Sequence, residues 1–156
     1  MLLQMIKEAF SGVPLPKADN LAASGGAEAF EEANAFRGQP WQELDASFLH
    51  RYRDALFWFT PEAFHYYLPG FLAASIETED ANALYVHNVL SFLRPPGSEN
   101  LVRFRRERLS MLSSSQLRVL EKWLEWLRTQ AIAGGVYEEE LNEACEVVRF
   151  RAWETW

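Results

Sequence analysis

Apolar side chains in the segment from Leu117 to Leu127 recur at alternating steps of three and four residues. This spacing places them on one face of an α-helix. The same period returns in most other apolar segments of the chain. No convincing run alternates apolar and polar residues with the period of two that is typical of strands. The sequence therefore predicts an all-α fold.

Capping residues divide this pattern into separate helices. Asp45 is a plausible N-cap, Thr60-Pro61-Glu62 combines a cap with a first-turn proline, and Ser113 with Gln116 has capping-box form. We expect seven candidate helical segments. They cover Leu2–Phe10, about Ala27–Arg37, Asp45 to Phe59, Pro61 through Leu72, Asp80 to Leu93, Ser113 to Ala131, and Glu138 to about Trp153, with Asp80 as the cap of the fifth. Pro69-Gly70 should kink or split the fourth, and Gly134-Gly135 should end the sixth. We expect a compact bundle of six or seven helices.

Length and composition place this bundle in one soluble domain. The chain has 156 residues, 49% of them hydrophobic, which suits a single packed domain spanning residues 1–156. One cysteine excludes an intrachain disulfide framework and a Cys-based zinc site. No stretch approaches the length of a membrane span, and the N-terminal segment lacks the features of a secretory leader. We therefore expect a cytoplasmic protein.

Negative charge is concentrated in the first two-thirds of the chain. Residues 1–99 hold 13 acidic and 6 basic side chains, whereas residues 100–156 hold 9 of each, so the net charge of −7 arises before residue 100. Such a field repels nucleic acid and anionic membranes. It is compatible with a basic protein partner.

The residues that usually carry chemistry are scattered. His50, His65 and His87 are far apart, and the Glu62/His65 spacing has no second copy, which a carboxylate-bridged metal site would need. There is no glycine-rich phosphate loop and no G-x-S-x-G motif. The sequence thus predicts no catalytic residues, no metal and no cofactor.

One basic cluster stands out in the second half of the chain. Its members are Arg103, Arg105, Arg106 and Arg108. A nucleic-acid interface would need a wider basic field. We expect these arginines to pair with acidic residues of the first two-thirds or to lie solvated around a buried Phe104.

A dense aromatic block runs from Phe57 to Phe71. Helical spacing cannot turn all of these rings toward one core. An inward-facing set is Phe59, Phe64, Tyr67 and Phe71. Trp58 and Tyr66 are left for an edge or groove, where such side chains often anchor protein interfaces.

The same region carries a family resemblance that spans nearly the whole chain. The segments concerned are Asp54-Ala55-Leu56, Thr60-Pro61-Glu62-Ala63-Phe64, Tyr66 to Leu72, Ile6 to Phe10 with Val13-Pro14, Phe36-Arg37-Gly38 with Trp41, and the start of the Leu112 to Leu124 helix. Together they resemble a family of small bacterial proteins of unknown function. The resemblance implies no catalytic residue. Small acidic cytosolic bacterial proteins of this kind often act as immunity proteins.

These observations favour a non-enzymatic protein that binds another protein, most concretely an immunity protein or antitoxin that neutralises a basic toxin. The candidate partner-binding residues are Glu31, Glu32, Glu77, Glu79 and Asp80 as rim charges, and Trp58 and Tyr66 as anchors. One alternative is a small-molecule binder or enzyme with an aromatic pocket near Glu62, His65 and Tyr66. Another is a structural homo-oligomer that uses a face with Trp123 and Trp126.

Overall fold

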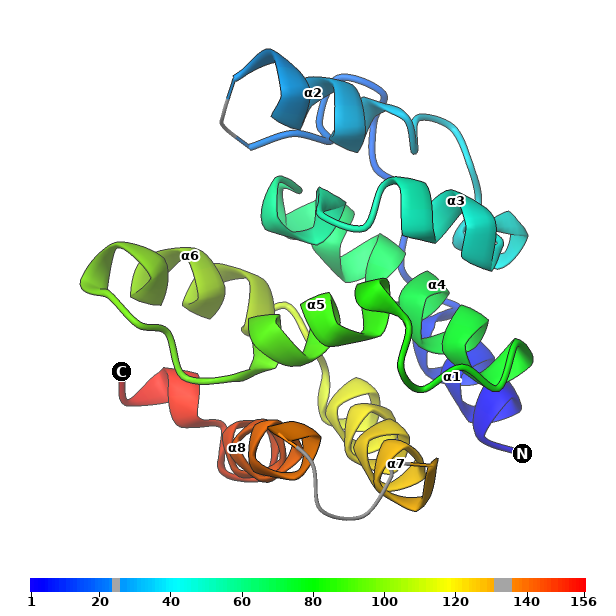
Figure 1. The fold of residues 1–156 in the computed structure, drawn as a ribbon. Helices are drawn as coiled ribbons and strands as arrows, with labels where there is room; N and C mark the ends of the chain where they lie inside the picture. The colour runs from blue at the N-terminus through cyan, green and yellow to red at the C-terminus, as the bar shows by residue number, and fades with distance from the viewer. Residues whose placement is uncertain (24–25, 131–135) are drawn as a thin grey trace.

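The computed structural model describes residues 1–23, 26–130 and 136–156. Within these ranges the chain forms α-helices and short 3₁₀ helices but no β-strand, so the all-α prediction is confirmed (Figure 1). The α-helices are α1 (Leu2–Phe10), α2 (Ala27–Asn34), α3 (Ala46–Arg51), α4 (Pro61–Glu77), α5 (Leu84–Leu93), α6 (Glu99–Leu109), α7 (Ser114–Gln130) and α8 (Val136–Phe150). The 3₁₀ helices are η1 (Trp41–Glu43), η2 (Ala55–Phe57) and η3 (Ala152–Glu154). The expected six or seven helices are close to the eight α-helices observed.

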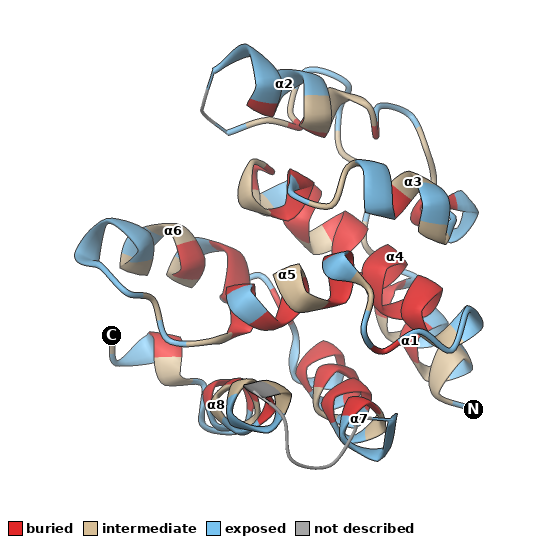
Figure 2. Cartoon of the chain, viewed as in Figure 1, coloured by how far each residue is buried: buried red, intermediate tan, exposed pale blue. Residues whose placement is uncertain are grey.

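Helix α4 forms the centre of the molecule and is buried along most of its length (Figure 2). Thr60 caps it by accepting a hydrogen bond from the Ala63 amide at 3.1 Å, as predicted. The helix continues through Pro69 and Gly70, so this pair does not split it. The inward aromatic set predicted for this region is confirmed, because Phe59, Phe64, Tyr67 and Phe71 are all fully buried.

The other elements cover α4 in layers. Helix α1 packs between α4 and α7, while α8 closes the opposite side against α5 and α7. Helix α2 lies at the far end of the molecule, where it packs on η2 (Figure 1). The first turn of α4 follows η2 directly, so α2 sits near the N-terminal end of the central helix.

Several predicted helix boundaries differ from the structure. Helix α4 extends to Glu77 instead of Leu72, and α8 covers Val136–Phe150 instead of Glu138 to about Trp153. The helix expected from Asp45 to Phe59 is interrupted, because Tyr52 leaves helical geometry (φ −111°, ψ 37°) after α3. Asp80 does not cap α5; its carboxylate accepts from the Asn82 amide, and the N-cap position is Ala83. Helix α2 ends at Asn34 rather than Arg37. Gly134 and Gly135, expected to end α7, lie outside the described residues.

Helix α6 was not predicted, and its burial explains why. Two arginines, Arg105 and Arg108, form much of its inward face. A pattern search for apolar residues therefore finds no helical stripe between residues 99 and 109.

Buried polar contacts join helices that are distant in sequence. The predicted capping box is confirmed: Ser113 Oγ accepts from the Gln116 amide at 3.2 Å, and Gln116 Oε1 accepts from the Ser113 amide at 2.9 Å. The same Gln116 side chain donates to the Ala9 carbonyl at 3.0 Å and lies 2.8 Å from His65 Nε2. One amide thus connects α7 to α1 and α4. Over the described ranges, no helix is both long and apolar enough to cross a membrane.

Candidate functional site

The arginine cluster on α6 serves the fold. Arg108 donates to the Phe59 carbonyl, and Arg105 donates to the Ser91 and Arg94 carbonyls at 2.8 Å each. The Arg108 guanidinium also lies 3.4 Å from the ring centroid of Phe104, which is half-buried rather than buried. The expected pairing with acidic residues of the first two-thirds is wrong, since Arg105, Arg106 and Arg108 bind backbone carbonyls instead. Arg103 is exposed and pairs with Glu107 of its own helix.

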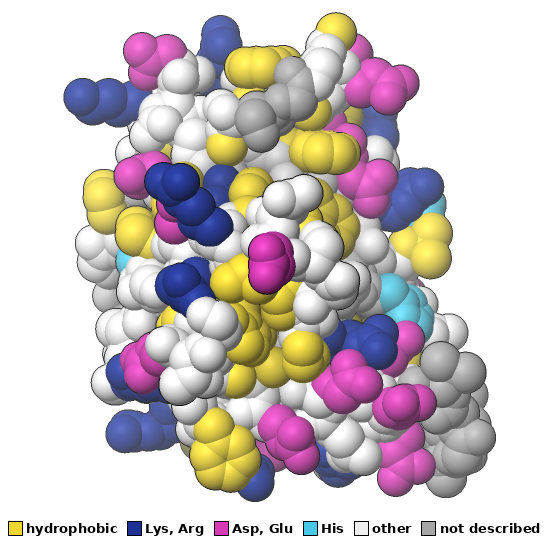
Figure 3. Space-filling model, turned by 90° about the vertical axis from the view of Figure 1, so that its left-hand side faces the viewer, with side chains coloured by type: hydrophobic (Ala, Val, Ile, Leu, Met, Phe, Trp, Pro, Cys, Tyr) yellow, Lys and Arg dark blue, Asp and Glu magenta, His cyan; other side chains and the backbone are white. Residues whose placement is uncertain are grey.

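The surface on this side of the molecule is mixed in character. Figure 3 shows hydrophobic side chains at the centre of this face, with side chains of both charges around them. The α6 arginines therefore do not create a continuous basic surface on the face shown.

The three residues named for an aromatic pocket, Glu62, His65 and Tyr66, differ in their surroundings. Glu62 is exposed, whereas Tyr66 is only 7% exposed and accepts a hydrogen bond from the Trp41 amide at 3.3 Å. The His65 ring is committed to Gln116 and lies edge-on to Phe10. These three side chains therefore contact different parts of the molecule. Among the described residues, no three His, Cys, Asp or Glu side chains gather as metal ligands.

One further expectation about an exposed aromatic side chain is wrong. Tyr66 does not lie at an edge, because it is buried between α4 and η1. Trp123 is fully buried and donates to Ser75 Oγ at 2.9 Å, while Trp126 is half-buried. Trp123 is thus part of the core and Trp126 lies at its edge, and the homo-oligomer alternative stays a prediction.

The acidic candidates fall into two groups at opposite ends of α4. Glu31 and Glu32 lie on α2, near the start of α4. Glu77, Glu79 and Asp80 lie at the exposed turn where α4 ends. A helix of 17 residues is about 25 Å long. The two groups therefore cannot contact a small partner surface together.

The group on α2 borders a depression of about 390 Å³. Its lining residues are Glu28, Glu31, Glu32, Arg51, Tyr52, Arg53 and Asp54. The first three belong to α2 and form one wall, and the other four follow along the end of α3 and form the second. We refer to this feature as the α2–α3 depression.

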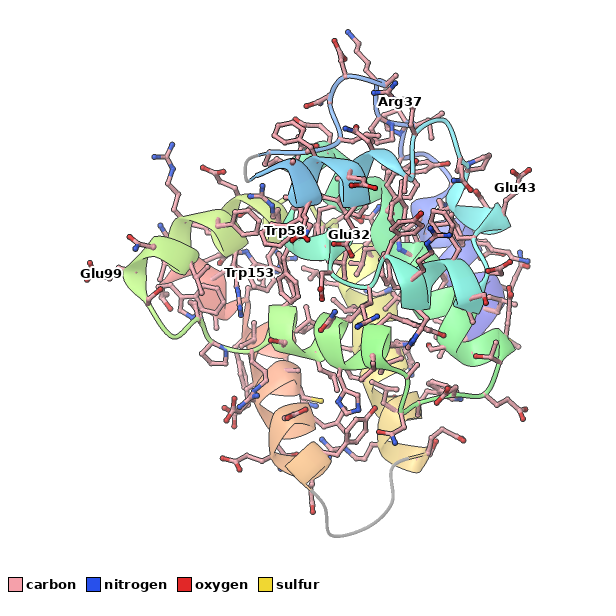
Figure 4. The ribbon with its side chains drawn as sticks, turned by 45° about the horizontal axis from the view of Figure 1, so that its top comes forward. Glu32, Arg37, Glu43, Trp58, Glu99 and Trp153 are labelled. Carbon is pink, nitrogen blue, oxygen red and sulfur yellow. The ribbon has the colours of Figure 1, made fainter. Side chains whose placement is uncertain are left out.

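Glu32 ties the two walls together. Its carboxylate accepts from the Asp54 amide at 3.0 Å and from Trp58 Nε1 at 3.3 Å. Figure 4 shows the Glu32 and Trp58 side chains next to each other. Burial raises the pKa of Glu32, and the nearby Asp54 carboxylate raises it further, while the two hydrogen bonds and Arg53 lower it. Glu32 therefore connects α2 to the segment after α3 through hydrogen bonds, and it also contributes a carboxylate to the lining of the depression.

The second wall is held by side chains that replace helical hydrogen bonds. Arg53 Nη1 donates to the His50 carbonyl at 2.9 Å at the end of α3. Asn88 of α5 donates to the Arg53 carbonyl at 2.8 Å and to Asp54 Oδ1 at 2.9 Å. These contacts fix the irregular 51–54 segment beside α2. The depression is thus built on restrained backbone.

The α2–α3 depression can bind charged groups. Its lining includes residues that the sequence analysis did not identify as candidates. Glu31 and Glu32 were among the predicted residues, whereas the other lining residues were missed. Trp58, also a predicted residue, does not line the depression but donates a hydrogen bond to Glu32. Glu28 could have been found, because residues three and four apart share one helix face. The 51–54 segment was hidden by the incorrect prediction of a continuous helix from Asp45 to Phe59.

Comparison with known proteins gives a family without an assigned activity. The family model described as "Family of unknown function (DUF6714)" matches residues 1–134. No curated protein and no solved structure shows a significant match. The matched segment includes α1 to α7, and therefore both walls of the α2–α3 depression. The resemblance seen in the sequence is confirmed, and the chain belongs to this family of unknown function.

Proposed function

We propose that the chain is a non-enzymatic protein-binding protein, most concretely a bacterial cytoplasmic immunity protein or antitoxin that neutralises a basic cognate toxin. The observation that carries this proposal is the α2–α3 depression with its carboxylates. The side chains of Glu28 and Glu31 have no hydrogen bond or ion pair within the described residues. A basic protein surface is the natural complement of such a site.

Unpaired acidity in the first part of the chain supports the same function. In the described ranges, every ion pair joins residues between 87 and 154. The carboxylates that precede residue 87 are therefore not neutralised by salt bridges. Unpaired surface charge of one sign steers an oppositely charged partner and raises the association rate.

Trp58 provides an anchor beside these charges. It is half-buried, and Glu32 holds its indole N–H in one orientation. A side chain that is already ordered loses less conformational entropy when a partner binds. Tryptophan is also frequent among the residues that dominate interface energies. Trp58 is therefore retained as an anchor in this proposal, and Tyr66 is not.

Co-expression tests the proposal directly. Each toxin-like reading frame encoded beside this gene would be induced in bacteria with and without this chain, and growth would be measured. We expect growth to be rescued by the wild type and by E77K/E79K, but not by E28K/E31K. The two double variants change the net charge equally at opposite ends of α4. Toxicity that co-expression leaves unchanged would contradict the proposed function.

A further inference from the structure

The two walls of the α2–α3 depression carry opposite charges. Glu28, Glu31 and Glu32 line the α2 wall, whereas Arg51, Arg53 and Asp54 line the wall that follows α3. The second wall keeps a net positive charge from its two arginines, and its Asp54 carboxylate already accepts a hydrogen bond from Asn88. These charges do not pair with one another, because all ion pairs of the described residues lie beyond residue 86. Arg53 is close enough to lower the pKa of Glu32 without forming an ion pair with it. Unpaired charge of both signs is thus presented in one concave site.

The arginines of the second wall retain unused donors. Arg51 is exposed, and its guanidinium lies 5.3 Å from the ring centroid of Tyr52. Arg53 directs Nη1 to the His50 carbonyl, while its other guanidinium nitrogens have no hydrogen-bond partner in the described ranges. An arginine offers five N–H donors in a fixed plane and can bind a carboxylate through two of them. The second wall can therefore accept a carboxylate.

We propose that the α2–α3 depression binds a mixed-charge polypeptide segment of the partner protein. Lysine or arginine side chains of this segment lie against the α2 wall, and an aspartate or glutamate lies against Arg51 and Arg53. Tyr52, which also lines the depression, contacts the aliphatic stems of the partner's basic side chains. This inference rests on the proposed protein-binding function and specifies the chemistry of the partner at that site.

Opposite charges on two walls determine the direction in which a segment can bind. A segment bound in reverse places lysine beside Arg51 and Arg53 and glutamate beside Glu28 and Glu31. Like-charge contacts of this kind are unfavourable and exclude the wrong register. The net negative charge of the chain attracts any basic partner. The α2–α3 depression, with its two oppositely charged walls, favours those basic partners that also carry a suitably placed carboxylate.

Peptide binding to the isotope-labelled full chain tests this inference. Three synthetic peptides of equal length would be titrated: one with lysine and glutamate, one with lysine only and one with glutamate only, each completed with alanine. Nuclear magnetic resonance would follow the Trp58 indole N–H and the amides of residues 28–32 and 51–54. We expect the mixed peptide to move all of these resonances and to bind about tenfold more tightly than the lysine peptide.

Charge reversal of Arg51 and Arg53 distinguishes recognition of a mixed-charge segment from attraction of basic groups by the carboxylates alone. We expect R51E/R53E to weaken the mixed peptide about tenfold while leaving the lysine peptide as tight or tighter. E28K/E31K should weaken both peptides. E77K/E79K is the matched control and should change neither. Unchanged circular dichroism and thermal unfolding would show that each variant folds.

Several results would overturn the inference. The first is that the wild type binds the lysine peptide as tightly as the mixed peptide, or more tightly. The second is that R51E/R53E binds the mixed peptide more tightly than the wild type does. The third is that no peptide shifts the resonances. Free lysine, which carries both charges, is a further probe; equal binding of free lysine would show a small-molecule site instead. If growth rescue succeeds while these tests fail, the binding function stands and only the mixed-charge recognition is wrong. If the mixed peptide binds as expected but growth rescue fails, the site stands and the toxin assignment is wrong.

Discussion

The Arg108 guanidinium joins α6 to the residue before the cap of α4. Arg108 is only 2% exposed, and its Nε and Nη2 atoms donate to the Phe59 carbonyl at 3.1 Å and 2.8 Å. Burial lowers its pKa to about 10, so the side chain stays charged at neutral pH. Its free energy of desolvation is offset by these charged hydrogen bonds.

Replacing Arg108 by lysine tests this contact. A lysine keeps the charge but cannot reproduce the two parallel donors, so R108K should lower the free energy of unfolding by about 2–4 kcal/mol. The exposed neighbour Arg103 provides the control, and R103K should change stability by less than about 0.5 kcal/mol. Urea denaturation measures both. Equal stability of the two variants would show that the Arg108 contact contributes little.

Glu32 makes the stability of the protein depend on pH. Its folded-state pKa is raised above the ordinary value of 4.5, so the folded chain holds that proton more tightly than the unfolded chain. The stability contributed by protonated Glu32 is fully present below pH 4.5 and is lost as the pH rises through the folded-state pKa.

The variant E32Q removes this titration. The difference in unfolding free energy between the wild type and E32Q should therefore decrease as the pH rises from about 4 to about 7. Urea denaturation at several pH values measures the difference. An increase with pH would mean that the hydrogen bonds from Asp54 and Trp58 outweigh burial at this carboxylate.

At the scale of elements, α4 depends on a glycine at the point where η1 crosses it. A Cβ atom on Gly70 would lie 3.1 Å from Leu44 Cδ1 and 3.3 Å from the Trp41 carbonyl oxygen. A branched side chain there must displace η1. We expect G70V to cost about 1–3 kcal/mol, as measured by thermal and urea unfolding. G12V is the control, because nothing lies within 4 Å of its Cβ position; equal effects of the two would contradict the crossing contact.

Two of the helix caps expected from sequence, Asp45 and Thr60, are present, whereas Asp80 does not cap α5 and the end of α3 was not predictable. Asp45 and Thr60 each bind an amide three residues later, so sequence spacing alone reveals them. The end of α3 depends on Asn88, which lies 35 residues beyond the Arg53 carbonyl that it binds. Helix α6 was missed for a related reason: its buried arginines find their partners only in the folded chain. Contacts of this kind leave no local pattern.

In the candidate site, too, some features are visible in the sequence and others depend on contacts between distant residues. The acidity of α2 and the aromatic character of Trp58 are visible in the sequence, and both belong to the α2–α3 region. The sequence could not show that Glu77, Glu79 and Asp80 lie at the far end of α4, or that Tyr66 is buried against η1. Nor could it show that Glu32 binds Trp58 rather than solvent.

At the scale of the whole molecule, charge is segregated along the chain. Ion pairs neutralise carboxylates only beyond residue 86 among the described residues, while the carboxylates nearer the N-terminus have no ion-pair partner within those ranges. Two acidic groups could therefore attract a basic partner, one at each end of α4. The group on α2 lies beside a depression and an ordered tryptophan.

The affinity of the purified complex with the cognate toxin, compared between two charge reversals, tests the central claim most directly. Both E28K/E31K and E77K/E79K change the net charge by the same amount, so a difference between them isolates the contribution of the α2–α3 depression. Isothermal titration calorimetry should show a loss of affinity of at least about tenfold for E28K/E31K and little change for E77K/E79K. Equal losses for the two variants, or no loss for either, would contradict the assignment of the depression as the binding surface.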